Sequence, residues 1–548
     1  MSEQGLREII DIPDLGIVMS DGVRLSARVW MPVDAGEDPV PAVLEHLPYR
    51  KRDGTCARDE ISHPWMAARG YAMVRVDMRG TGDSEGLMQD EYTPQELADA
   101  CEVIAWLAAQ DWCSGAVGMM GKSWGGFNCL QTAFLQPPAL KAVISVCSTT
   151  DRFADDIHFK GGCLLGENFG WGAVMLSYSS RPADPALRPD WREDWLARLE
   201  AEPWLAPRWA AMQEKNAYWK HGSVCEDYAR MQTPVLIWGG WADNYMNTVS
   251  HLVENLRAPV KGIVGPWVHK YPHFAVPGPR IGFLQEAERW WARWLKDTPT
   301  GVEDDPDYTV YLMDGVRPAT WYLERPGRWI VADASGGEVT RHHLAGQALA
   351  ATPGPVEALV ASPQHTGGDS GEYCAIWLGP EMPGDQRADD ALSVVWEGDT
   401  LAQDCAISGA PHVALRLMSD KPLGQIAVRL CHVHPDGATT RITYGVLNLA
   451  HRNGHARPEP LPVGEVVEVA LDLDHIAYCV PAGHRLRLAV SNAYWPLLWP
   501  SPEAGQLTIS GGYVDMPCVV RPQRDERVFP EPDSEAAWET EPLRAGDN

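Results

Sequence analysis

The chain contains 548 residues, of which 45% are hydrophobic, and its formal net charge is −28 at pH 7. This length is too great for one hydrophobic core and predicts roughly three domains of ordinary size. An acidic surface repels phosphate backbones, and no stretch approaches the roughly 18 apolar residues of a membrane span, so we expect neither a nucleic-acid nor a membrane partner.

The N-terminal residues 1–8 lack the basic and then apolar pattern of a signal peptide. The 12 cysteines include no Cys-x-x-Cys pair, and Cys101, Cys129 and Cys147 lie inside apolar segments, where we interpret them as small buried hydrophobic residues. A reducing cytoplasm is therefore the expected location. We expect neither a metal ion nor a cofactor.

The first predicted elements are strands. Residues 16–19 and 23–30 alternate in hydrophobicity around a Ser-Asp-Gly turn and predict a strand pair. Residues 41–47 and 71–77 predict two further strands. The segment 78–86 is a glycine-rich loop that lacks the Gly-Lys-Ser/Thr ending of a phosphate-binding loop.

A helix follows this loop. Thr93 is a suitable N-cap, Pro94 suits the first helical position, and Glu96 completes a capping box. Apolar residues at spacings of three and four continue to Ala108. Strands that alternate with helices indicate a parallel sheet covered on both faces, which is the α/β class.

An apolar run at 116–120 enters the sequence Gly-Lys-Ser-Trp-Gly at 121–125, and a helix-compatible segment follows. This pattern predicts the nucleophile elbow of an α/β-hydrolase, with Ser123 as the nucleophile. The strand and the helix of such an elbow approach so closely that glycines must flank the serine, and Gly121 and Gly125 meet that need. The alternative is an ordinary loop, because the pentapeptide alone is common.

The rest of the chain divides into segments of different character. Residues 150–232 carry tryptophans, charges and little alternation, and predict a helical cap inserted into the catalytic domain. The strand rhythm resumes from 233, so 1–149 and 233–330 together form the predicted α/β-hydrolase domain. Short alternating strands separated by turns in 331–548 predict an all-β sandwich of the jelly-roll type.

A nucleophilic serine requires a base and an acid that orients the base, and in α/β-hydrolases the acid and then the histidine follow the serine along the chain. Asp243 and His269 each lie just beyond an apolar strand-like run, downstream of Ser123. We therefore predict Ser123, Asp243 and His269 as the catalytic triad. The alternatives are a turn-forming aspartate, a structural histidine, and His273 as the base.

An oxyanion hole requires two hydrogen-bond donors. The backbone N–H of Trp124, the residue after the nucleophile, is one donor by its position in the elbow. Tyr49 lies on the loop after an early strand, and its phenolic hydroxyl is a competent second donor. The alternative for Tyr49 is a packing role.

The segments 47–51, 77–86, 121–126, 240–243 and 265–269 occur together in this chain. Together they resemble the cocaine-esterase and X-Pro dipeptidyl-peptidase family of α/β-hydrolase serine hydrolases, and the resemblance extends to 481–488 and covers nearly the whole chain. It implies a hydrolase core, a helical cap and a β-sandwich that contributes to the acyl pocket. It also implies the same triad, with the Tyr49 hydroxyl and the Trp124 N–H as oxyanion donors.

Relatives that hydrolyse α-amino acid esters carry extra acidic residues directly after the triad acid. This chain has Asn244, Tyr245 and Met246 at those positions. Either Asp155, Asp156 or Glu167 of the predicted cap takes over the binding of a substrate ammonium group, or these three belong to a solvated acidic face.

The sequence therefore predicts a serine hydrolase that cleaves a carboxylic ester through an acyl-enzyme intermediate. Trp171, Trp241 and Trp267, together with Trp124, are predicted to form an aromatic substrate pocket. The alternatives are an Xaa-Pro dipeptidyl-peptidase or other amide hydrolase and, from another class, a glycan-binding protein with a vestigial hydrolase core. The expected partner is a small-molecule ester or short peptide, and a homodimer is compatible with the sequence.

Overall fold

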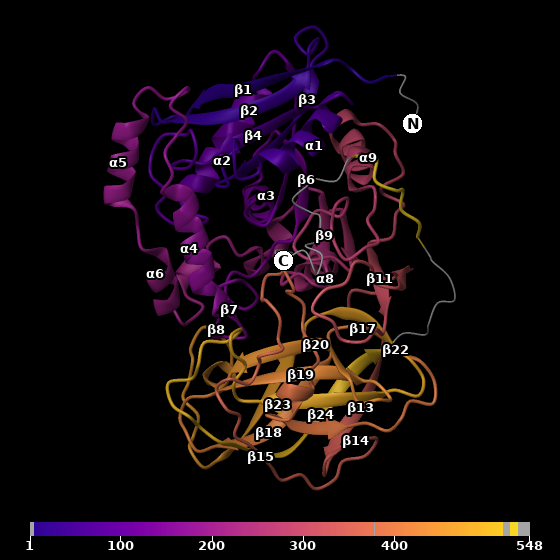
Figure 1. Ribbon diagram of the computed structural model, residues 1–548. Coiled ribbons are helices and arrows are strands. Elements are labelled where there is room, and N and C mark those ends of the chain that lie inside the picture. Colours follow the sequence, from indigo (N-terminus) through magenta and orange to yellow (C-terminus); the bar gives the residue numbers. More distant parts are fainter. Residues whose placement is uncertain (1–4, 377–378, 519–526, 535–548) are drawn as a thin grey trace.

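The computed structural model describes residues 5–376, 379–518 and 527–534. The N-terminal part of the chain alternates strands with helices, and the C-terminal part consists mainly of strands (Figure 1). These two parts lie one above the other in the view of Figure 1, with a set of helices on the flank of the upper part.

The upper part is built on one mixed sheet. Its strands follow the spatial order β1-β2-β4-β3-β5-β6-β9-β10-β11-β12, and the central pairs from β4 to β11 are parallel. The strands are β1 (Ile9–Val18), β2 (Arg24–Pro32), β3 (Val40–Leu47), β4 (Ala72–Asp77), β5 (Cys113–Lys122), β6 (Leu140–Val146), β9 (Val235–Gly240), β10 (Val260–Gly265), β11 (Tyr308–Asp314) and β12 (Gly327–Val331).

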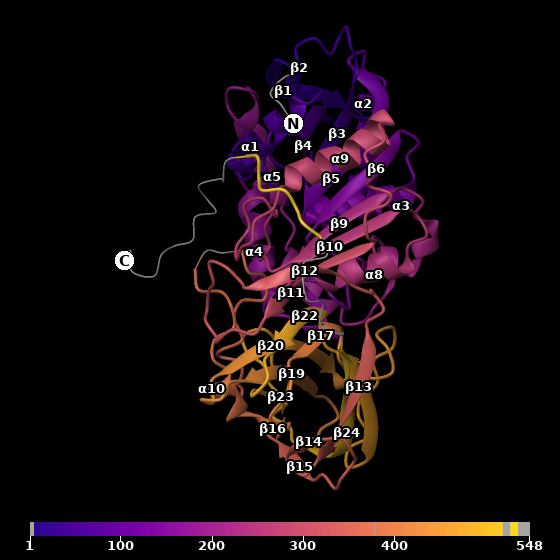
Figure 2. The ribbon, with the colours of Figure 1, turned by 90° about the vertical axis from the view of Figure 1, so that its right-hand side faces the viewer.

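Helices cover both faces of this sheet, as a buried parallel sheet requires. Helices α1 (Cys56–Ala67) and α9 (Phe283–Lys296) pack against each other and the sheet, while α2 (Pro94–Ala108) and α3 (Trp124–Leu135) form a second pair and α8 (Asn247–Asn255) packs on β9 and β10. Figure 2 shows α1 to one side of the central strands and α3 and α8 to the other. Because both faces are covered, every residue of β3, β4, β9 and β10 is buried.

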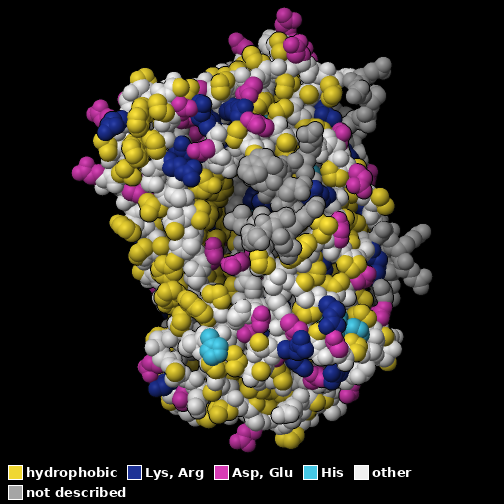
Figure 3. Space-filling view, viewed as in Figure 1, with side chains coloured by type: hydrophobic (Ala, Val, Ile, Leu, Met, Phe, Trp, Pro, Cys, Tyr) yellow, Lys and Arg dark blue, Asp and Glu magenta, His cyan; other side chains and the backbone are white. Residues whose placement is uncertain are grey.

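The segment between β6 and β9 is largely helical. It contains the short strands β7 (Phe159–Lys160) and β8 (Cys163–Leu164), the helices α4 (Glu167–Ser179), α5 (Trp191–Ala201), α6 (Leu205–Ala211) and α7 (Ala217–Lys220), and the 3₁₀ turns Val224–Glu226 and Tyr228–Arg230. Figure 3 shows hydrophobic side chains gathered over this flank. Its exposed apolar residues include Phe169, Val174, Leu176, Leu196, Leu199 and Trp204.

The C-terminal part pairs its strands almost entirely antiparallel. One group has the order β21-β18-β24-β13, and another has the order β20-β19-β23-β16. The elements are β13 (Glu338–Ala345), β14 (Ala348–Ala350), β15 (Ala358–Val360), α10 (Arg387–Asp390), β16 (Val394–Glu397), β17 (Cys405–Gly409), β18 (His412–Ser419), β19 (Gln425–Val433), β20 (Thr439–Asn448), a 3₁₀ turn (Leu449–His451), β21 (Val466–Asp472), β22 (Ile476–Val480), β23 (Arg485–Ser491) and β24 (Leu507–Cys518).

The two parts are joined by strand pairing. The end of β11 pairs in parallel with β22, with Met313 opposite Tyr478 and Asp314 opposite Cys479. Hydrogen bonds therefore run from the sheet of the upper part into the C-terminal strands. Within the described residues, no helix combines the length and the apolar character needed to cross a bilayer.

Candidate active site

Ser123 occupies a strained turn between β5 and α3. Its backbone has φ 60° and ψ −126°, a conformation that L-residues rarely adopt. A Cβ on Gly121 would lie 2.5 Å from the carbonyl carbon of Gly125, and a Cβ on Gly125 would lie 2.8 Å from Leu47 Cδ2. The strand–turn–helix arrangement expected of a nucleophile elbow is therefore present. Backbone contact requires glycine at 121, whereas a side chain at 125 would have to displace the end of the Leu47 side chain.

A cavity of about 390 Å³ lies at this turn. Ser123, His269 and Tyr49 all line it, so the structure brings together three of the residues that the sequence singles out. The segment between β6 and β9 supplies another wall with Ile157, Glu167, Trp171, Val174 and Tyr178. Cys374 and Ile376, from the C-terminal part of the chain, also line the cavity.

His269 and Asp243 form a hydrogen-bonded pair. Asp243 follows β9 and His269 follows β10, so neighbouring parallel strands deliver the two side chains to the same edge of the sheet. Nδ1 of His269 lies 2.8 Å from Oδ1 of Asp243, and both residues are buried. The carboxylate thus fixes Nδ1 as the protonated nitrogen and leaves Nε2 as an acceptor.

The electrostatic surroundings keep His269 neutral. Burial lowers the pKa of His269, and the nearby ammonium of Lys122 lowers it further, while Asp243 acts in the opposite direction. Lys122 Nζ donates to the backbone oxygen of His269 at 3.1 Å. Burial and Lys270 lower the pKa of Lys122 itself to about 8.

His273, the alternative base, lies in a different environment. It is buried, its Nε2 is 3.4 Å from Ser62 Oγ, and its ring stacks on Phe283. Burial lowers its pKa to about 3. Among the described residues, His273 is not part of the wall of the cavity that holds Ser123.

The two expected oxyanion donors converge beside the serine. The Tyr49 hydroxyl lies 3.4 Å from Ser123 Oγ. The backbone N–H of Trp124 is directed at the Tyr49 hydroxyl. Burial raises the pKa of Tyr49 well above its usual value, so the phenol keeps its proton and remains a donor.

Glu96 is a site residue that the sequence analysis assigned to a different role. Thr93 does cap α2 by accepting from Glu96 N, but the Glu96 carboxyl does not complete a box with it. Instead, Glu96 Oε1 accepts from the Trp124 indole at 2.6 Å and from Asn128 Nδ2 at 2.7 Å. Burial raises the pKa of Glu96 to about 8. This carboxyl holds the first turn of α3, and with it the Trp124 N–H.

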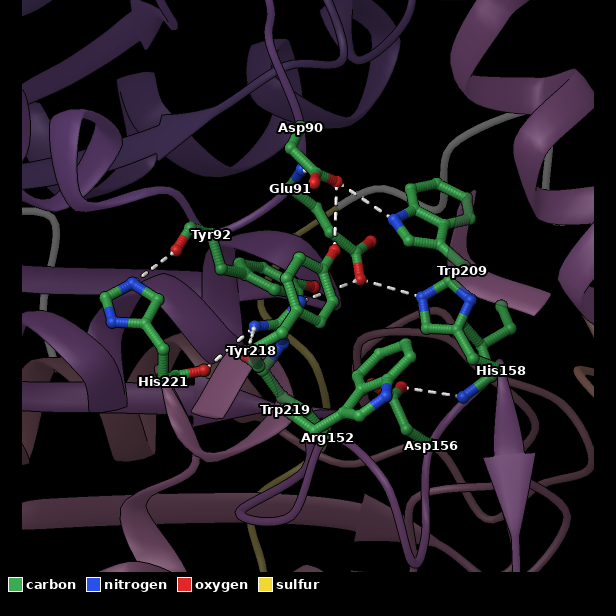
Figure 4. A network of polar contacts seen from close by, with 12 residues as sticks. Asp90, Glu91, Tyr92, Arg152, Asp156, His158, Trp209, Tyr218, Trp219 and His221 are labelled. Carbon is green, nitrogen blue, oxygen red and sulfur yellow. Dashed lines mark hydrogen bonds and ion pairs between the residues drawn. The ribbon is translucent and has the colours of Figure 1, made fainter. Parts of the chain in front are cut away.

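A buried polar network anchors the cavity wall (Figure 4). Glu91 accepts from Trp171 Nε1 at 3.3 Å and pairs with Arg152 at 3.3 Å and with His158 at 2.7 Å. Arg152 in turn donates to the backbone oxygens of Tyr218 and His221. The carboxylate of a loop that precedes α2 is thus bonded to several parts of the segment between β6 and β9.

The tryptophans predicted to bind substrate are not all at the cavity. Trp171 lines it, whereas Trp241 and Trp267 are buried elsewhere in the part of the chain that the structure describes. The Trp241 indole donates to the backbone of β11, and Trp267 packs against Trp238. The indole of Trp124 is directed at Glu96, so this residue contributes its backbone rather than its ring.

The three carboxylates of the predicted cap also differ in position. Asp155 pairs with Lys160, and Asp156 accepts from Tyr245 and is buried. Glu167 alone of the three lines the cavity that holds Ser123. Its side chain has no hydrogen-bond or ion-pair partner among the described residues, and burial raises its pKa to about 7.

Comparisons with known proteins agree with this architecture. Residues 21–271 match the X-Pro dipeptidyl-peptidase (S15 family) domain, and 300–528 match the X-Pro dipeptidyl-peptidase C-terminal non-catalytic domain. A cocaine esterase from a Rhodococcus species is 26% identical over 541 residues, covering 88% of this chain and 90% of that protein. A putative Xaa-Pro dipeptidyl-peptidase from Streptomyces avermitilis is 22% identical in an alignment that covers 86% of this chain and 76% of that protein.

Solved structures show the same fold. An α-amino acid ester hydrolase superposes with a TM-score of 0.73 at 19% identity, covering 95% of this chain and 98% of that chain. A CocE/NonD family hydrolase from Staphylococcus aureus gives a TM-score of 0.70 at 17% identity and 94% coverage of both.

The fold and the strained serine define an α/β-hydrolase with an additional C-terminal β domain, as predicted. The chain belongs to the cocaine-esterase and X-Pro dipeptidyl-peptidase family of serine hydrolases.

The position of Lys122 leads to a prediction about pH. A cation beside His269 disfavours the imidazolium, so the acid limb of kcat/KM for an ester should lie below pH 6.5, the ordinary histidine value. Replacing Lys122 by methionine removes that charge and should raise the midpoint of the limb toward 6.5. Lys141→Met, which removes an exposed lysine of β6, is the control and should leave the profile unchanged. Coincident profiles for all three proteins would contradict the electrostatic role of Lys122.

Proposed function

We propose that the protein is a serine esterase in which Ser123 is the nucleophile, His269 the base and Asp243 the acid that orients the base. One observation carries the proposal: a serine in a strained elbow shares a cavity with a buried histidine whose Nδ1 is bonded to a carboxylate. In this proposal, residues 1–149 and 233–330 form the catalytic domain, 150–232 the cap, and 331–548 the jelly-roll domain.

The reaction follows from the geometry. Nε2 of His269 takes the proton of Ser123 Oγ as this oxygen attacks the ester carbonyl, and the new oxyanion accepts hydrogen bonds from the Tyr49 hydroxyl and the Trp124 N–H. The imidazolium then protonates the departing alkoxide, which leaves an acyl group on Ser123. A water molecule, deprotonated by His269, attacks this acyl group and releases the carboxylic acid and the free serine.

The cavity favours an aromatic or apolar substrate. Tyr49, Trp171, Tyr178, Tyr245 and Phe274 contribute aromatic side chains to its walls. Rings of this kind bury large apolar areas and pack against other rings. The similarity to a cocaine esterase and an α-amino acid ester hydrolase supports an ester as the substrate, and the similarity to Xaa-Pro dipeptidyl-peptidases supports amide cleavage as the alternative.

Glu167 favours a second candidate, an ester or amide whose acyl group carries an amine. The carboxyl of Glu167 lines the cavity without a protein partner in the described chain, and a substrate ammonium would provide one. An α-amino acyl group and the free N-terminus of a peptide share this chemistry. The catalytic steps are the same for both candidates, so Glu167 bears on substrate choice alone.

The nucleophile assignment predicts the behaviour of Ser123→Ala. This variant should fold normally and lose hydrolysis of p-nitrophenyl esters by a factor of about 10⁴–10⁶, because the covalent step has no nucleophile. A fluorophosphonate probe should label the wild-type protein on Ser123, as located by mass spectrometry, and should not label the variant. An adduct on another residue, or undiminished turnover in the variant, would refute the proposal.

The oxyanion assignment predicts a specific loss in Tyr49→Phe. This change removes one hydroxyl and keeps the ring, so kcat should fall about 10²–10³-fold while KM changes little, because negative charge develops only in the transition state. A thermal melt of the variant should match the wild type. If Tyr49 only packs against its neighbours, kcat will stay within a few-fold of the wild type.

The role of Glu167 is tested with two substrates that differ by one amino group, the p-nitrophenyl esters of phenylglycine and of phenylacetic acid. In Glu167→Gln, kcat/KM for the phenylglycine ester should fall at least about tenfold, because a charge-assisted hydrogen bond is lost. The phenylacetate ester should be hydrolysed within a few-fold of the wild-type rate. Equal effects on both substrates would exclude recognition of the amine by Glu167.

A further inference from the structure

Three histidines meet at one end of the C-terminal domain, away from the catalytic cavity. His432 lies in β19, His434 follows two residues later, and His484 immediately precedes β23. Each offers a ring nitrogen, and these three nitrogens lie within 4.8 Å of one another. The ring centroids of His432 and His434 are 4.0 Å apart, and those of His432 and His484 are 4.8 Å apart.

Strand geometry explains why they converge. Side chains at positions i and i+2 of a strand point to the same face, which places His432 and His434 together. In the antiparallel pair of β19 with β23, His432 is opposite Leu486 and Val433 is opposite Arg485. One further step of this register brings His434 opposite His484, so the third ring arrives from the neighbouring strand.

Two of the nitrogens are in direct contact, and all three lie within 4.8 Å of one another, so the rings need to shift by at most about 1.5 Å to share an ion. His432 Nε2 and His484 Nδ1 are 2.6 Å apart. At this distance one of the two nitrogens carries a hydrogen and the other accepts it through its lone pair. In a tetrahedral site with metal–nitrogen bonds of about 2.0–2.1 Å, two ligand nitrogens lie about 3.3 Å apart. The two rings therefore need to separate by less than about 1 Å for an ion to take the place of that hydrogen.

The surrounding groups orient the rings as the outer partners of metal ligands do. The Tyr478 hydroxyl lies 2.9 Å from His432 Nδ1, which directs Nε2 of that ring toward His484. The Thr440 hydroxyl lies 3.1 Å from His434 Nε2 and donates to a backbone carbonyl of residue 316, which fixes the plane of the second ring. His432 and His434 are buried and His484 is partly exposed, so an ion can enter from solvent beside His484.

We propose that His432, His434 and His484 form a binding site for a divalent transition-metal ion of the type that imidazole ligands prefer, such as Zn²⁺. Three imidazoles leave a fourth position for water.

Two other groups of possible ligands in the described chain do not share these features. Glu45, Asp59 and His63 lie together, but Arg58 and Arg75 already pair with the carboxylates and repel a cation. Cys147 lies beside Asp243 and His269, where the two triad candidates bind each other.

The site lies at the junction of the two parts of the chain. Tyr478, which contacts His432, is the residue of β22 that pairs with Met313 at the end of β11. A Cβ on Gly315, directly after β11, would lie 2.8 Å from the His432 ring. An ion bound here cross-links β19 and β23 beside this junction, so it should stabilise the folded protein in proportion to the logarithm of its free concentration.

The test uses the untagged full chain after treatment with a chelator, titrated with ZnCl₂ by calorimetry. The wild type should bind one equivalent at the cluster, and His434→Ala and His484→Gln should lose this event or weaken it at least 100-fold. Tyr478→Phe should weaken it about 10–100-fold by releasing the His432 ring. With Co²⁺ in place of Zn²⁺, the wild type should show the visible absorption of a low-symmetry site, and the two histidine variants should not.

His412→Gln is the matched control, because this histidine belongs to the same domain and pairs with Asp472, apart from the three-histidine cluster. The control should bind Zn²⁺ and be stabilised by it in a thermal melt as the wild type is. Ester hydrolysis of the metal-free variants should equal that of the metal-free wild type, which establishes that they are folded. Zn²⁺ binding that is equal in the wild type and His484→Gln, or no stoichiometric binding to either, would overturn the proposal.

Discussion

The close crossing of β5 and α3 at Ser123 is the constraint on which the rest of the site depends. The backbone of Gly125 excludes a side chain at Gly121, and a Cβ on Gly126 would lie 2.8 Å from the carbonyl oxygen of Val146 in β6. The strained serine is retained because strand pairing and helix packing fix the chain on both sides of it. The same turn directs the Trp124 N–H toward Tyr49 and places Lys122 against the backbone of His269.

Buried ion pairs hold the segment between β6 and β9, which forms one wall of the cavity, against the core. The segment between β6 and β9 is attached to the core through Glu91, Arg152 and His158, all three of which are buried. Removing one partner from such a set leaves an uncompensated charge in a medium of low polarity, which is strongly unfavourable. The wall that carries Trp171 is therefore positioned by a network that resists partial disruption, and the shape of the cavity depends on residues that never contact its interior.

The sequence could predict what depends on local pattern, and it missed what depends on distant partners. The buried strands β3, β4, β9 and β10 were recognisable because their apolar runs end at turns, and the elbow because its glycines have a steric cause. Helix α1 was not predicted, since Thr55 makes no side-chain cap and the helix contains Pro64, a residue that is unfavourable in a helix interior. Glu96 was interpreted as a capping residue because the local pattern fits one, whereas its carboxyl is bonded to Trp124 on another helix. Trp267 was likewise predicted to line the substrate pocket because it is close to His269 in the sequence, whereas its ring packs against Trp238, away from the cavity. The histidine cluster joins residues some 50 positions apart, so the spacing of histidines in the sequence does not predict it.

The loop of the C-terminal domain around residue 375 connects this domain to the cavity at Ser123, which matters for exchanging domains between relatives. The backbone N–H of His269 donates to Ala375 O, and Cys374 and Ile376 on either side line the cavity that holds Ser123. A domain described as non-catalytic in the matching family thus supplies part of the cavity wall at Ser123 and an acceptor for the backbone N–H of His269. A chimera that exchanges this domain between relatives replaces Cys374, Ala375 and Ile376, and with them part of the cavity wall at Ser123. An experiment that swaps the two domains to compare substrate preferences should therefore keep this loop and the hydrolase core from the same parent.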